Sequence, residues 1–133
     1  VKLYLLCASI RKSSFLNLID FLRGYNKAIA FFDEFSSRII LSPIVIAESY
    51  AGVKGDDELT VLDNFITLFI VVSPTAEIAT LGGLYKRDFG KSHGVGLADA
   101  ILAATAEVEK AKLKTLNVKH YPMFKVLKPA FKK

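Results

Sequence analysis

Three side chains in this sequence could bind a metal ion or act on a charged substrate: Glu48, Asp99 and Asn117. Glu48 follows the apolar run Pro43 to Ala47, where a carboxylate is costly unless it is exposed or paired. Exposure on a helix surface explains Glu48 equally well when this segment is taken alone. The three residues follow strands closely or stand in a small-residue helix, and strand ends can bring such groups together.

Asp99 stands in the segment Gly96 to Ala106, which is rich in small residues and has no lysine or arginine to pair with it. We expect it in the first turn of a helix, where the helix dipole favours a negative charge by about 0.3 to 1 kcal/mol. That effect explains the aspartate without any ligand, and metal binding is the alternative. Asn117 follows a short predicted strand, so an ordinary turn asparagine is the competing interpretation there.

The elements that must position these residues alternate between strands and helices. Strands are predicted at Val1 to Leu6, Arg38 to Leu41, Phe69 to Val72, Lys114 to Leu116 and Lys125 to Leu127. Helices are predicted at Phe15 to Arg23, Lys27 to Phe35, Pro43 toward Gly52, Asp57 to Leu68, Pro74 to about Phe89 and Leu97 to Ala111. Ser42 and Ser73, each followed by proline, are the predicted caps of two of these helices.

This alternation predicts an α/β fold with a mainly parallel central sheet and helices on both faces, in three layers. In such sheets the ligand site lies beyond the carboxyl ends of the strands, where the strand order reverses. With 133 residues, 52% of them hydrophobic, we expect a single domain over residues 1–133 and no extensive disorder.

Composition excludes several classes of protein. One cysteine, Cys7, cannot form an internal disulfide and provides no zinc motif. The longest apolar run, near Phe65 to Val72, is well short of the roughly 18 residues of a membrane span, and no cleavable signal pattern precedes Arg11. We therefore expect a cytoplasmic protein that does not enter the membrane.

The net charge of +5 suits a polyanionic partner, but a basic soluble domain would show the same charge. The lysine-rich end, Lys125 to Lys133, is expected to be a solvated tail, with contact to nucleic acid as the alternative.

Five segments together resemble the PIN domain, and within it the VapC-type toxins of bacterial and archaeal toxin–antitoxin pairs. They follow the order in which the family has them and span nearly the whole chain: Leu18 to Gly24, Leu41 to Gly52, Gly90 to Gly94, Leu97 to Ala106 and Thr115 to Tyr121.

The resemblance implies a ribonuclease in which acidic residues hold Mg²⁺ or Mn²⁺, ions that suit hard carboxylate oxygens. Carried over by position, Glu48 matches the family's second acid, Asp99 its third, and Asn117 a last site that is Asp or Asn. The resemblance makes Glu48 and Asp99 the metal ligands and all three residues catalytic. It also implies an RNA substrate, an antitoxin in the active-site groove and a homodimer. The apolar excess of so small a chain favours a dimer too, and apolar surface on the helices after Gly24 or at Asp57 to Leu68 is the expected interface.

The sequence departs from the family at its first acid. The family's first strand normally ends in Asp followed by Thr or Ser, whereas this chain has Leu5-Leu6-Cys7-Ala8-Ser9 and no acid before Asp20. Alignment on the strand puts Cys7 at the acid's place, and counting back from Gly24 puts it near Ser14. A thiolate is a soft ligand and a poor substitute for carboxylate on magnesium. Asp20 could take the place of this acid only if its helix were shifted in register relative to the matching segment of the family.

Two histidines are candidates for a general base, but we interpret His120 as a residue that packs at an edge and His93 as a loop residue. The missing acid leaves a second hypothesis open, a catalytically impaired PIN domain that still binds RNA or antitoxin. A third is an RNA-processing nuclease of the same fold that lacks an antitoxin.

Overall fold

The computed structural model describes residues 3–6, 30, 39–114 and 121–124. The helix expected at Phe15 to Arg23 and the strand expected at Lys125 to Leu127 lie outside these residues. The helix expected at Lys27 to Phe35 lies outside them too, apart from Ala30.

The described strands form one parallel sheet in the order β3-β2-β1-β4. Their bounds are Leu3–Leu6 for β1, Ile39–Leu41 for β2, Ile70–Val71 for β3 and Ala111–Lys114 for β4. The chain builds the sheet outward from β1 to β3 and then returns to place β4 on the other side of β1. The strand order therefore reverses at β1, where a ligand site is expected in an open parallel sheet.

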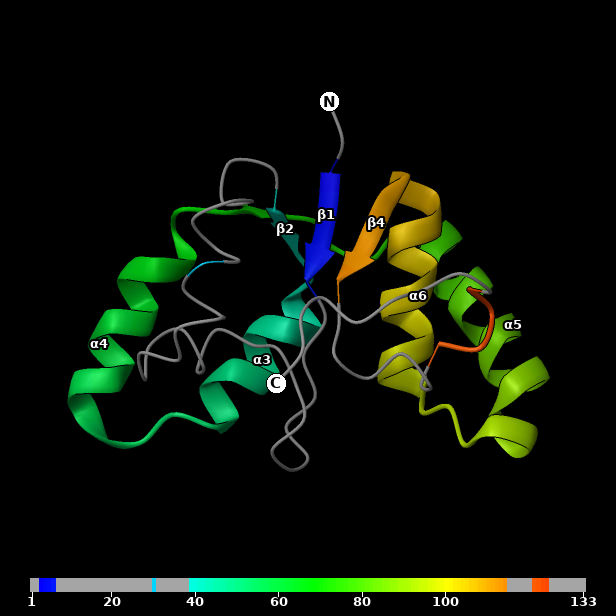
Figure 1. Cartoon of the computed structure of the whole chain (residues 1–133), viewed down its shortest axis with the longest axis horizontal. Helices are drawn as coiled ribbons and strands as arrows, with labels where there is room; N and C mark the ends of the chain where they lie inside the picture. The colour runs from blue at the N-terminus through cyan, green and yellow to red at the C-terminus, as the bar shows by residue number, and fades with distance from the viewer. Residues whose placement is uncertain (1–2, 7–29, 31–38, 115–120, 125–133) are drawn as a thin grey trace.

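Helices cover both sides of this sheet, which confirms the predicted three-layer α/β arrangement. Figure 1 shows α3 and α4 on one side and α5 and α6 on the other. Their bounds are Pro43–Ala51 for α3, Gly55–Ile66 for α4, Ala76–His93 for α5 and Leu97–Glu109 for α6. Within the described ranges, none of the helices has both the length and the apolar character needed to cross a membrane.

The start of α3 follows the sequence prediction. The Ser42 side chain accepts a hydrogen bond from the Ile44 amide at 3.2 Å, and Pro43 occupies the first helical position, where its missing N–H costs nothing. Gly52 ends the helix, and its amide donates to the carbonyls of Ser49 and Tyr50. Because β2 ends at Leu41, helix α3 begins directly at the carboxyl end of that strand.

The predicted start of α5 is wrong. The cap is Thr75 and not Ser73, because the Thr75 hydroxyl accepts from the Ile78 amide at 3.2 Å and the helix begins at Ala76. The helix also continues past Phe89 to His93, and it ends where Gly94 takes a left-handed conformation with φ of 66°.

The predicted end of α6 and start of β4 are also displaced. Helix α6 ends at Glu109, Lys110 turns the chain in a left-handed conformation, and β4 begins at Ala111. The strand begins three residues earlier than predicted because Ala111 already pairs with Leu3 of β1.

The core lies between the sheet and its helices. Leu5 of β1, Leu41 of β2 and Leu62 of α4 are fully buried, as are Leu102 and Ala103 of α6. The run of small residues in α6 therefore faces neighbouring elements and lets them approach closely. This burial fixes the position of the helix that carries Asp99.

Candidate metal site at the carboxyl ends of the strands

Glu48 lies on α3, the helix that follows β2, and it is partly buried. Its Oε1 atom is buried and receives no hydrogen bond within the described part of the chain. The interpretation of Glu48 as an exposed surface residue is therefore wrong. A buried carboxylate oxygen without a donor is costly in free energy, so this atom calls for a partner that the described part of the chain does not supply.

Burial and a second negative charge raise the pKa of Glu48 to about 7. Desolvation is the larger cause, and the charge of Asp99 is the second. The Coulombic effect means that the two carboxylates are close enough to repel one another. The structure thus brings together two of the three residues that the sequence singled out.

Asp99 is the third residue of α6 and lies in its first turn, as expected. It is partly buried, and the Tyr121 hydroxyl donates a hydrogen bond to its Oδ1 at 3.2 Å. Sequence reasoning did not select Tyr121 as a site residue. It stands 22 positions beyond Asp99, and the sequence marks it only as the last residue of the segment Thr115 to Tyr121.

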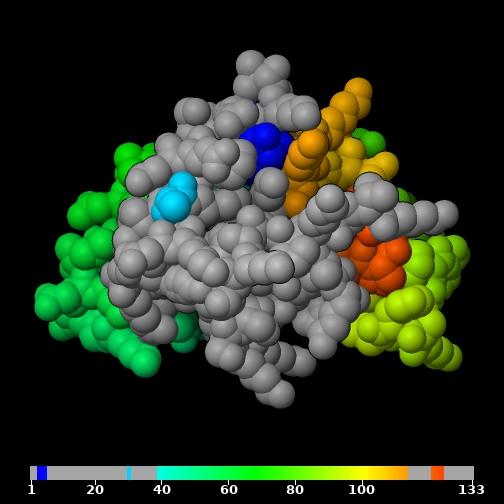
Figure 2. Space-filling model, viewed as in Figure 1, coloured from blue at the N-terminus to red at the C-terminus, as the bar shows by residue number. Residues whose placement is uncertain are grey.

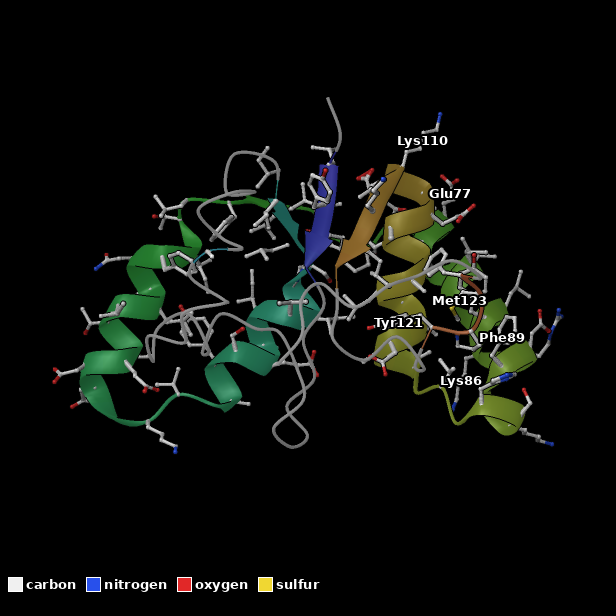
Figure 3. All side chains as sticks on the ribbon, in the orientation of Figure 1. Glu77, Lys86, Phe89, Lys110, Tyr121 and Met123 are labelled. Carbon is white, nitrogen blue, oxygen red and sulfur yellow. The ribbon has the colours of Figure 1, made fainter. Side chains whose placement is uncertain are left out.

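The loop before α6 is held by a lysine of α5. The Lys86 ammonium donates to the carbonyl of Val95 at 2.9 Å, and the Val95 side chain is buried. Gly90 stands one turn after Lys86, and a Cβ there would lie 3.2 Å from the Lys86 Cδ atom. Because Gly90 has no side chain, the aliphatic part of Lys86 can pass close to its backbone. Figure 3 shows Lys86 near the C-terminal end of α5. This contact restrains the loop that leads into the helix of Asp99.

Four other residues discussed from sequence, Asn117, Cys7, Asp20 and His120, lie outside the described residues. His93 is described, and its interpretation as a loop residue is wrong. It is the last residue of α5, where its ring packs edge-on against Phe89 and its Nδ1 lies 2.7 Å from the Ser92 hydroxyl.

Two neighbouring carboxylates at the carboxyl-end side of a parallel sheet are able to hold a cation between them. A divalent ion would relieve their repulsion and would give the buried Glu48 oxygen a partner, and carboxylate oxygens are the donors that Mg²⁺ and Mn²⁺ prefer. Within residues 3–6, 39–114 and 121–124, no group of three or more His, Cys, Asp or Glu side chains is placed to hold a metal. The residues therefore fit a hard cation, with two carboxylates in the described part.

The chain is similar to several known proteins in sequence and in fold. The sequence model of the PIN domain matches residues 14–121. Ribonuclease VapC19 of Mycobacterium tuberculosis is 37% identical over 117 residues, which cover 85% of this chain and 93% of that protein. Ribonuclease VapC10 of the same species is 37% identical over 94 residues, or 70% of each chain.

Solved structures share the fold at lower identity. A toxin–antitoxin complex from Klebsiella pneumoniae superposes with a TM-score of 0.78 at 20% identity, over 98% of this chain and 99% of that chain. DNA-bound VapBC from Salmonella typhimurium superposes with a TM-score of 0.71 at 19% identity, over 92% of each chain. With a profile match over most of its length and curated relatives above one third identity, this chain belongs to the PIN domain family.

Proposed function

We propose that this protein is a metal-dependent endoribonuclease, the toxin of a VapBC-type toxin–antitoxin pair that acts in the cytoplasm. The single observation that carries the proposal is the pairing of Glu48 with Asp99, in which one buried oxygen of Glu48 has no donor among the described residues. The relatives at 37% identity are ribonucleases of the VapC type, which supports RNA as the substrate.

In this proposal Glu48 and Asp99 hold Mg²⁺ or Mn²⁺, and Asn117 assists catalysis as a neutral residue. When bound, the ion lowers the pKa of a water molecule and offsets charge on the scissile phosphate. The protein contributes a rigid pair of carboxylates, since α3 is anchored by its Ser42 cap and α6 by the buried face that packs on the sheet. Fixed charges of this kind need little reorganisation when the substrate arrives.

The partners belong to the proposal as well. VapBC and toxin–antitoxin complexes among the structural neighbours support an antitoxin protein as a partner. A homodimer is supported by exposed apolar side chains on α4 and next to it, where Val61 is 50% exposed and Leu68 is 71% exposed. Such a surface is typical of a contact with another chain.

A second function, an impaired PIN domain that binds RNA or antitoxin without cutting, is favoured by one observation. Alignment on the first strand puts Cys7 at the place of the family's first acid, and in the described ranges no third acidic side chain joins Glu48 and Asp99 in a group that could hold a metal. Fewer ligand charges weaken the binding of a hard dication. The two functions therefore differ in metal affinity and in cleavage rate.

An RNA cleavage assay with Mn²⁺ tests the proposal on the parent protein, Asp99→Asn and Cys7→Asp. The parent should cleave slowly, and Asp99→Asn should lose at least about a hundredfold, or about 2.7 kcal/mol of transition-state stabilisation. Cys7→Asp should increase both metal affinity and rate, because it returns a negative charge to the strand end.

Asp57→Asn is the matched control. Asp57 is also the third residue of its helix, α4, and lies in its first turn, so its replacement removes the same favourable interaction with a helix dipole. It should leave cleavage unchanged. Full activity in Asp99→Asn would place the chemistry elsewhere in the molecule. A parent that binds RNA but shows no cleavage, with or without Cys7→Asp, would favour the impaired domain.

A further inference from the structure

Tyr121 is buried, with 2% of its surface exposed, and its side chain has a polar end directed at a carboxylate. The ring belongs to the hydrophobic core, and the hydroxyl donates to Asp99 Oδ1 at 3.2 Å. Figure 2 shows the segment of Tyr121 to Phe124, in orange-red, against the yellow-green surface of the end of α5 and the start of α6. The contact therefore joins a segment after β4 to the first turn of α6.

The packing of the ring determines where the hydroxyl can lie. A tyrosine has few rotatable bonds, and the turn in which the Phe124 amide donates to the Tyr121 carbonyl at 3.0 Å restrains its backbone. Figure 3 shows Tyr121 beside the lower part of α6, well away from Lys110 at the other end of that helix. A hydroxyl held in this way limits rotation of the Asp99 carboxylate.

We propose that Tyr121 is a positioning residue of the metal site, whose hydroxyl orients the Asp99 carboxylate for the divalent cation. This inference rests on the proposed function, because it assumes that Asp99 is a ligand. Carboxylates that bind metal are commonly oriented by hydrogen bonds from residues around them, and loss of such a bond lowers metal affinity about 10- to 100-fold.

The two carboxylates of the proposed site then have different roles in binding the ion. Tyr121 orients Asp99 before the ion binds. The buried Oε1 of Glu48 has no donor in the described structure, so it remains available to coordinate the ion. Because folding already restricts the Asp99 side chain, metal binding costs less conformational entropy at this ligand.

Tyr121→Phe separates this role from simple packing, since it keeps the ring and removes only the hydroxyl. Tyr50→Phe is the matched control, because the Tyr50 hydroxyl also donates to a carboxylate, Asp63 Oδ1 at 2.5 Å, but on the exposed surface between α3 and α4. Isothermal titration calorimetry with Mn²⁺ measures the affinity of each protein, and thermal unfolding without metal shows that each is folded.

We expect Tyr121→Phe to bind Mn²⁺ about 10- to 100-fold more weakly than the parent and Tyr50→Phe to bind within about twofold of it. RNA cleavage by Tyr121→Phe should recover toward the parental rate at saturating Mn²⁺, which a general loss of structure would not allow. In an Asp99→Asn background, Tyr121→Phe should have no further effect on Mn²⁺ binding, as expected of two coupled residues.

Parental affinity in Tyr121→Phe would overturn this inference and leave the proposed function standing. An equal loss in both phenylalanine variants would also overturn it, since the effect would then not be specific to Asp99. A parent protein that binds no Mn²⁺ would overturn the inference together with the proposed function.

Discussion

The Asp99 carboxylate lies close enough to Glu48 for its charge to help raise the pKa of Glu48 to about 7, although the larger cause is burial of Glu48 itself. The two residues come from different helices, α3 and α6, and from distant parts of the chain. Their proximity links the protonation of Glu48 to the stability of the fold, and it would link both to the binding of the proposed cation.

Metal affinity should depend on pH through Glu48. A metal ion must displace the proton, and a carboxyl group with a pKa of about 7 is mostly protonated at pH 6 and mostly ionised at pH 8. The apparent affinity for Mn²⁺ should therefore rise about tenfold from pH 6 to pH 8 and level off above it. Calorimetric titration across this range measures the effect, and a constant affinity would mean that the pKa of Glu48 is ordinary.

The stability of the metal-free protein should change in the opposite direction with pH. The pKa of Glu48 is about 7 in the folded chain and 4.5 in its ordinary state, so the folded protein binds more protons than the unfolded chain between these values. The contribution of Glu48 to the free energy of unfolding therefore falls as pH rises from about 4.5 to 7. Thermal unfolding of the parent minus that of Glu48→Gln isolates this contribution, and a difference independent of pH would contradict it.

Glu48→Gln should stabilise the metal-free protein while it removes metal binding. At pH 8 the substitution removes a partly buried negative charge and its repulsion with Asp99, which we expect to be worth about 1 kcal/mol after solvent screening. That corresponds to roughly 3 to 5 °C in Tm. Added Mn²⁺ should raise the Tm of the parent and leave that of Glu48→Gln unchanged.

Glu77→Gln is the control for that experiment. Glu77 is an exposed acid in the first turn of α5, so its replacement should leave the Tm unchanged or slightly lower. A Glu48→Gln protein less stable than the parent at pH 8 would show that the carboxylate makes favourable interactions in the folded state.

Close packing of α5 on α6 depends on Gly82. A Cβ at Gly82 would lie 3.0 Å from Ile101 Cγ1 and 3.2 Å from its Cα, so the two helices would have to move apart. Gly82→Ala should therefore destabilise the protein by about 1 to 3 kcal/mol. Gly83→Ala is the control in the same helix, because a Cβ there meets nothing within 4 Å and alanine favours the helix by about 1 kcal/mol. Urea unfolding of both variants measures the difference, and similar stabilities would contradict the close approach.

The proposed homodimer should depend on the apolar surface of α4. Val61→Asp puts a charge at a side chain that is 50% exposed on this helix, and it should raise the dimer dissociation constant at least about tenfold. Leu84→Asp is the control, since Leu84 is 41% exposed but lies on α5 at the other side of the sheet. Light scattering over a range of concentrations measures both, and a parent protein that is monomeric throughout would refute the dimer.

Local sequence determined the elements that carry the site. Ser42 and Pro43 predict where α3 begins, because a serine cap and a first-turn proline act within a few residues. The alternation of strands and helices likewise predicts a parallel sheet with helices on both sides, since parallel strands need crossovers. Glu48 and Asp99 are recognisable as candidates from their segments and from the resemblance to the PIN domain, but neither segment by itself excludes a structural role.

Other features depend on contacts between residues far apart in the sequence, and only the tertiary structure determines them. Ser73 and Thr75 can both cap a helix, and only the path of the chain out of β3 makes Thr75 the cap. The start of β4 at Ala111 depends on its pairing with Leu3, which lies at the opposite end of the sequence. Burial of Glu48 cannot be read from α3, because apolar residues occur all around that helix and no single face is marked as internal. The hydrogen bond from Tyr121 to Asp99 arises because folding places the segment after β4 against the first turn of α6, a proximity that no local pattern contains.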